Sequence, residues 1–77
     1  MNSKMERLTV EEQQIVSQIR VYERFTSIIL DTISEKPAEF HKLTVEEIMM
    51  LLHNKSQELQ TELIHIQLSK AFMIKEN

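Results

Sequence analysis

The fold of this chain is decided by the stretch that begins Leu-Thr-Val-Glu-Glu-Ile at residues 43–48 and continues to Lys75 without a proline or a glycine. Because no helix-breaking residue interrupts it, this stretch predicts one long α-helix, roughly 48 Å long at 1.5 Å per residue. Its start has the pattern of a capping box, in which Thr44 caps the helix and Glu47 bonds back to the cap. We therefore expect a helix over residues 44–75.

Apolar residues recur along this stretch at the spacing of a heptad seam, with Ser56 and Lys70 at the two positions that lack an apolar residue. The seam residues are Ile48, Leu52, Leu59, Leu63, Ile66 and Met73. A polar segment, residues 53–58, interrupts the pattern, so the alternative is a break that divides the chain into three helices. No glycine or proline forces that break, and we favour a continuous helix.

The first half of the chain predicts a second helix, over about residues 9–35. The pentapeptide Leu-Thr-Val-Glu-Glu occurs here as well, at residues 8–12, and again indicates a helix start, with Thr9 as the cap. A heptad seam follows, with Thr26 in its one gap, through Ile15, Ile19, Tyr22, Ile29 and Ile33. Further apolar residues lie beside this seam, so a single partner helix cannot cover the apolar surface.

Pro37 ends the first helix, because a proline disfavours helical geometry at the residue before it. Residues 36–43 then form a connector, with Phe40 as the apolar side chain that anchors it. A connector this short makes the two helices antiparallel neighbours. We expect residues 1–77 to form a single all-α domain, an antiparallel two-helix hairpin.

The composition supports the all-α class. None of the 77 residues is glycine, although average usage is about 7%. The tight turns of β-hairpins and the loops that bind phosphate groups both depend on glycine. An apolar content of 42% is too high for a disordered tail.

Candidate catalytic and metal-binding groups are sparse. The chain has no cysteine, and His41, His53 and His65 are spaced twelve residues apart rather than the three or four that a helical metal site needs. Adjacent glutamates such as Glu46 and Glu47 occur in first helical turns, where negative charge complements the helix dipole. We expect no enzymatic activity, no catalytic residue, no metal and no cofactor.

The sequence also bears on location. The first six residues contain no apolar segment typical of a signal peptide, and the longest apolar run, residues 48–52, is far shorter than the roughly 20 residues of a membrane span. A net charge of −3 disfavours broad adhesion to nucleic acid or anionic lipid. We expect a cytoplasmic protein without membrane association.

The excess apolar residues predict binding surfaces. We expect the hairpin to form a homodimer, a four-helix bundle, and to bind another protein. The residues expected to contact the second copy or a target are Val21, Phe25, Ile28, Met49, Met50, Leu68 and Phe72. Nucleic acid is the less favoured partner, and its candidate contacts are Arg20 and Arg24, the one concentrated basic pair.

Two resemblances accompany these patterns. The paired helices, with Leu52-His53 and Glu58-Leu59 in the second, resemble Rop, a plasmid RNA-binding protein that dimerises into a four-helix bundle; this resemblance implies an RNA partner. Ser56-Gln57-Glu58-Leu59 is similar to the signature of small sporulation aspartyl-phosphate phosphatases, also helical hairpins. That family needs an aspartate next, where this chain has Gln60. The likeness therefore implies docking on a response regulator rather than catalysis.

Taken together, the patterns favour a small non-enzymatic regulatory or adaptor protein that acts through helix-mediated protein binding. An RNA-binding hairpin and a response-regulator-docking protein are the alternatives.

Overall fold

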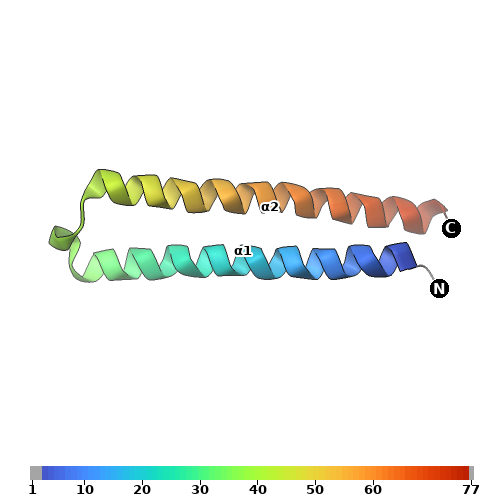
Figure 1. Ribbon diagram of the computed structural model, residues 1–77, viewed down its shortest axis with the longest axis horizontal. Coiled ribbons are helices and arrows are strands. Elements are labelled where there is room, and N and C mark those ends of the chain that lie inside the picture. The colour runs from blue at the N-terminus through green and yellow to red at the C-terminus, as the bar shows by residue number, and fades with distance from the viewer. Residues whose placement is uncertain (1–2, 77) are drawn as a thin grey trace.

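The computed structural model describes residues 3–76, and side chains as far as residue 74. It contains α1 (Ser3–Glu35), a 3-10 turn η1 (Pro37–Glu39) and α2 (Lys42–Glu76), with no strand among the described residues. The two long helices lie side by side, with η1 at one end and both termini at the other (Figure 1). The predicted all-α, antiparallel helical hairpin is confirmed.

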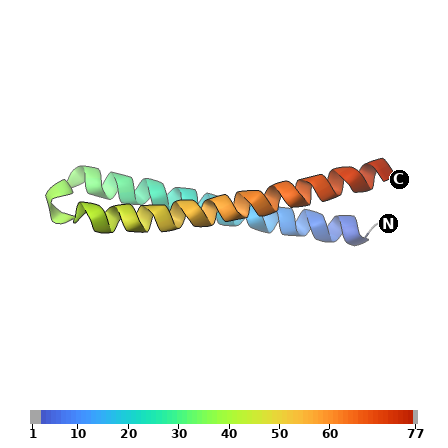
Figure 2. The ribbon, with the colours of Figure 1, turned by 90° about the horizontal axis from the view of Figure 1, so that it is seen from above.

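The helices cross at a shallow angle (Figure 2), and the molecule measures 59 × 16 × 13 Å over its Cα atoms. Shallow crossing is the geometry in which residues at alternating steps of three and four meet along a seam. In α1 the seam runs through Met5, Leu8, Glu12, Ile15, Ile19, Tyr22, Thr26, Ile29 and Ile33. In α2 it runs through Val45, Met49, Leu52, Ser56, Leu59, Leu63, Ile66, Lys70 and Met73.

The core is small and lies near the middle of the seam. Only Ile15, Ile19 and Leu59 are buried among the described residues, and Tyr22, Leu63 and Ile66 pack around them. Burying a side chain of this size stabilises a fold by roughly 1.5–3 kcal/mol. The other seam residues are only half-buried, so the apolar burial that the hairpin obtains by itself is limited.

The predicted seam of α2 is wrong at its start. Ile48 is 45% exposed, and the seam passes through Val45 and Met49 instead. A seam through Ile48 and a seam through Met49 both fit the sequence. Residues 48–52 are apolar without interruption, and either residue lies about one helical turn before Leu52.

The predicted start of α1 at Thr9 is also wrong. Thr9 lies inside α1, where its Oγ1 donates a hydrogen bond to the carbonyl oxygen of Met5 at 3.0 Å. The preceding residues allow the helix to extend, because Met5 and Leu8 continue the seam by one more heptad and no proline or glycine precedes them. A capping sequence therefore occurs here without a helix end.

The start of α2 at Lys42 depends on His41 rather than on Thr44. The backbone N–H of Thr44 donates to His41 Nδ1 at 3.3 Å, and Thr44 Oγ1 lies 2.9 Å from the same nitrogen. The N–H of Val45 donates to the carbonyl oxygen of His41 at 3.0 Å. His41 thus occupies the N-cap position, and Thr44 lies in the first turn.

α2 is continuous, so the alternative of three helices is wrong. The polar residues 53–58 remain helical, because Ser56 is small enough to lie in the seam and the residues around it face outward. Lys55 Nζ and Glu58 Oε2 form an ion pair at 3.5 Å on that outer surface. Within the predicted connector, Pro37–Glu39 form the 3-10 turn η1.

One seam layer consists of charged residues. Lys70 Nζ donates to Glu12 Oε1 at 2.9 Å, and the two side chains are only 22% and 24% exposed. This ion pair joins α1 to α2 near the open end of the hairpin.

Candidate functional site

Large apolar side chains that face solvent outnumber the buried ones in the described part of this protein. Fourteen are exposed, whereas three are buried, among the residues whose side chains the structure describes. Single exposed apolar residues are ordinary, but contiguous apolar surfaces mark interaction sites. The arrangement of the exposed residues on the two helices therefore defines the candidate sites.

Val21, Phe25 and Ile28 form one continuous stripe on α1, which we call the α1 flank. Steps of four and three residues place them on the same side of the helix. Each is exposed, with accessible fractions between 46% and 52%. The flank lies beside the seam, so pairing of α1 with α2 leaves it uncovered.

Leu68 and Phe72 form a second stripe, which with Ile64 we call the α2 back stripe. These three residues follow at steps of four and are exposed. They lie toward the C-terminal end of α2, whereas the α1 flank lies in the half of α1 that leads to the connector. The two stripes are therefore separate surfaces.

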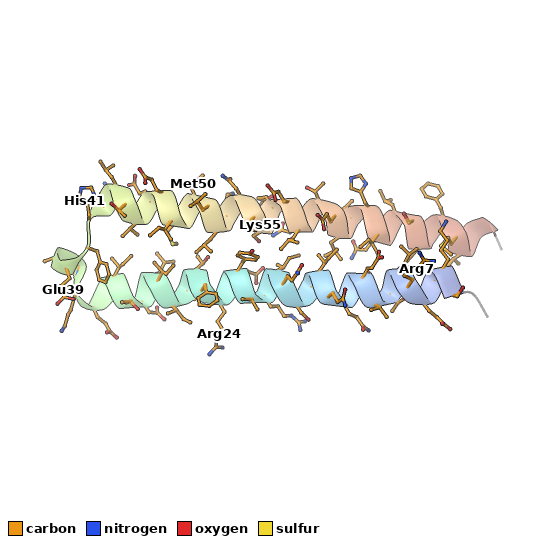
Figure 3. All side chains as sticks on the ribbon, viewed as in Figure 1. Arg7, Arg24, Glu39, His41, Met50 and Lys55 are labelled. Carbon is orange, nitrogen blue, oxygen red and sulfur yellow. The ribbon has the colours of Figure 1, made fainter. Side chains whose placement is uncertain are left out.

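Met49 and Met50 belong to neither stripe. Met49 is a half-buried seam residue, so it is less available to a partner than predicted. Met50, labelled in Figure 3, is exposed and lines two hollows together with residues of α1. The seven residues predicted to form a partner surface thus lie in three places rather than in one.

A groove between α1 and α2 runs along one side of the hairpin, which we call the groove face. It consists of three hollows, of about 620 Å³ near the connector, about 520 Å³ in the middle and about 440 Å³ beyond. Met49 and Met50 line the first two hollows, and Glu23 and Gln60 line the second and third. The shared residues make the hollows successive parts of one groove.

The groove face carries few charges. Lys42 and Glu46, at the connector end, form an ion pair at 3.9 Å. Arg20 and Glu23 are the other charged residues that line the groove. Low charge is typical of the centre of protein interfaces.

The opposite side of the hairpin is more polar where its helices meet. The hollow there, of about 430 Å³, is lined by Glu11, Glu62 and His65 together with glutamines and two seam isoleucines. Gln18 of this lining lies one turn before Val21 of the α1 flank, and His65 is next to Ile64 of the α2 back stripe. The two sides of the hairpin therefore present different chemistry to a partner.

Only one of the two arginines predicted as nucleic-acid contacts lines the groove. Arg20 lines the groove, whereas the side chain of Arg24 points away from α2 (Figure 3). Lys55, which shares the outer surface of α2 with Glu58, is paired with that carboxylate. These three basic residues do not form one continuous basic stripe.

The three histidines have separate environments. His41 caps α2, His53 lines the middle hollow of the groove, and His65 lines the hollow on the opposite side. No group of three or more histidine, aspartate or glutamate side chains close enough to hold a metal ion occurs in the part of the chain that the structure describes. Within the same part, neither helix is apolar enough over a sufficient length to cross a membrane.

Two features of the structure, the groove and the Glu12–Lys70 ion pair, were not predicted from the sequence. The groove depends on which side chains of two different helices face the same way, and only the register of the hairpin decides that. The sequence indicated one member of the Glu12–Lys70 pair, because Lys70 is a charged residue at a predicted seam position. Glu12, however, matched a capping box better than a seam.

Comparison with known proteins gave no match to a protein family model, a curated protein or a solved structure.

Proposed function

We propose that this chain is a small, non-enzymatic regulatory or adaptor protein that works by binding helices of other protein chains. The observation that supports the proposal is the excess of exposed over buried large apolar side chains, fourteen against three in the described part of the chain. Surfaces of this kind gain free energy when a partner removes them from water, at about 25 cal/mol per Å².

The first partner is a second copy of the chain, with which it forms a four-helix bundle. The accessible surface is 6316 Å², whereas a compact monomer of its mass, 9.2 kDa, would expose about 4,900 Å². The excess is on the order of 1,400 Å², and a standard interface buries about 800 Å² of each partner. One dimer interface therefore accounts for about half of the excess.

The second partner is a different protein, bound through apolar surface that the dimer leaves exposed. The α1 flank offers an aromatic anchor, Phe25, between two β-branched residues, which is a typical composition for the centre of an interface. The proposed site of action is the cytoplasm.

Self-association is tested by light scattering at high micromolar concentration, where we expect the mass of a dimer. A mass that remains monomeric over the whole concentration range would contradict the homodimer.

Binding of another protein is tested by affinity capture from the native cell, with and without nuclease treatment, using three baits. Phe25→Asp places a charge in the α1 flank, and Ser17→Asp places the same charge on an exposed position outside it. We expect the native chain and Ser17→Asp to capture the same protein and Phe25→Asp to lose it.

Two outcomes would contradict this mode of action. If the captured material disappears with nuclease, the protein binds nucleic acid, and its affinity should then fall steeply with salt. If a response-regulator receiver domain is captured and its phosphoryl group is lost faster with the native chain than with Gln57→Ala or Glu58→Ala, the chain is catalytic.

A further inference from the structure

We infer that two copies of this chain pair through their groove faces in an antiparallel arrangement, with Arg20 of each copy against Glu23 of the other. The inference rests on the proposed self-association and adds the face, the orientation and the contacting charges. A second copy is the occupant of the groove, and the α1 flank stays exposed on the outside of the dimer.

The groove face is suited to burial. Its three hollows extend from Phe40 at the connector to Val16 and Ile64 beyond the middle of the hairpin. Their lining is apolar or neutral apart from two pairs of charged residues. Lys42 and Glu46 form an ion pair within one chain, and the second pair is Arg20 and Glu23. The whole side of the hairpin that contains this groove, 59 Å long and 16 Å wide, has an area on the order of 900 Å², close to the roughly 800 Å² per partner of a standard interface.

Arg20 and Glu23 identify the partner as another copy. Both line the same hollow, and neither has an ion-pair or hydrogen-bond partner among the described residues. Burying either charge alone against an apolar surface would be costly. A partner must therefore supply one negative and one positive group at the same level of the groove, and a second copy carries that pair.

Symmetry then decides the orientation. In a twofold dimer, if residue i contacts residue j, then j also contacts i. Consider a twofold axis in the plane between the two faces that runs perpendicular to the helices and passes between Arg20 and Glu23. This axis places α1 on the partner's α1, with the two helices antiparallel. Arg20 then meets the partner's Glu23, and Glu23 meets the partner's Arg20. The axis crosses α1 (Ser3–Glu35) near its middle, so the two α1 helices overlap along most of their length. The hollow that Arg20 lines then lies against the middle hollow of the partner, and the hollow near the connector lies over the first half of the partner's α1.

The other symmetric arrangement does not match these charges. A twofold axis parallel to the helices would stack α1 on the partner's α2. At the level of Arg20 and Glu23, the groove lining of α2 consists of Gln60, Leu63 and Ile64. Both charges would then be buried against neutral side chains, so the antiparallel arrangement is the one that pairs them.

A charge-swap experiment tests the pairing by sedimentation at low salt, where charge interactions are least screened. A chain with Arg20→Glu presents two carboxylates to its copy, and a chain with Glu23→Arg presents two cations. We expect each variant alone to self-associate on the order of tenfold more weakly than the native chain, since like charges face each other. An equimolar mixture should form a heterodimer at native strength, because opposite charges then meet.

Arg24→Glu is the matched control: it makes the same change one turn away on a side chain that points away from α2, and it should leave association unchanged. Circular dichroism verifies that each variant retains native helicity. If the single variants dimerise like the native chain, or if the mixture remains as weak as its components, the pairing is wrong even though the proposed homodimer stands. If the native chain is monomeric, the proposed self-association itself fails.

The orientation has an independent readout, because the chain contains no cysteine and Glu39→Cys in η1 can be labelled selectively. Spin labels on the two copies should be separated by most of the 59 Å length of the molecule. Labels close together would show both connectors at one end and overturn the antiparallel arrangement.

Discussion

At the scale of single residues, the Glu12–Lys70 pair is the least expected feature of the seam. Heptad seams are normally apolar, and a charged residue there lowers stability while it favours one register. The 2.9 Å contact between Lys70 Nζ and Glu12 Oε1 joins the helices near the open end. A slip of one turn would separate the two charges, so this pair favours the observed alignment.

We predict that Lys70→Met lowers the free energy of unfolding by roughly 1–2 kcal/mol, because Glu12 remains partly buried without its partner. The double variant Glu12→Leu, Lys70→Leu should recover that loss or exceed the native stability, since an apolar layer replaces the ion pair. Urea unfolding followed by circular dichroism measures both. Equal destabilisation by the single and the double variant would show that the charges do not interact.

At the scale of the helices, the repeated pentapeptide Leu-Thr-Val-Glu-Glu shows how context decides a helix end. At residues 8–12 it lies within α1, with Thr9 bonded back to the preceding turn. At residues 43–47 it lies in the first turn of α2, whose cap is His41. The difference is the connector: the turn at Pro37 prevents α2 from extending further back, whereas nothing before Thr9 stops α1.

We predict that His41→Ala destabilises the hairpin by about 0.5–1 kcal/mol, because the N–H of Thr44 loses its acceptor. His41→Asp should retain the native stability or raise it, since aspartate is a strong N-cap residue and its charge complements the helix dipole. Thermal unfolding of the two variants measures the effect. If His41→Ala melts like the native chain, the capping role of this side chain is wrong.

At the scale of the whole molecule, a chain of 77 residues holds only three buried apolar residues among those described. A core this small gives marginal stability, since domains of this size depend on nearly all the apolar burial they can obtain. Association with a second copy would supply the missing burial, and folding and self-association are then coupled.

We therefore predict that the melting temperature rises with protein concentration, because binding of a second copy stabilises the folded state by mass action. Calorimetry over a hundredfold range of concentration measures the shift. Arg20→Glu should reduce this dependence, whereas Arg24→Glu should not. A melting temperature independent of concentration for the native chain would show that the hairpin is stable by itself.

The sequence by itself determined the helical class, the position of the connector and most of the seam, because these depend on local properties: the absence of glycine, the fixed geometry at Pro37 and the spacing of apolar residues. It left the phase of the seam open across residues 48–52, where every side chain is apolar. It also misplaced the starts of both helices, because a capping sequence is compatible with a helix interior.

Only the tertiary structure decided which exposed residues share a surface. Met50 and Arg20 lie in different helices, yet both line the groove, whereas Arg24, one turn from Arg20, does not line it and points away from α2. Periodicity places a residue on one side of its own helix. The register and crossing of two helices, set by packing along the seam and by the Glu12–Lys70 contact, determine which sides come together.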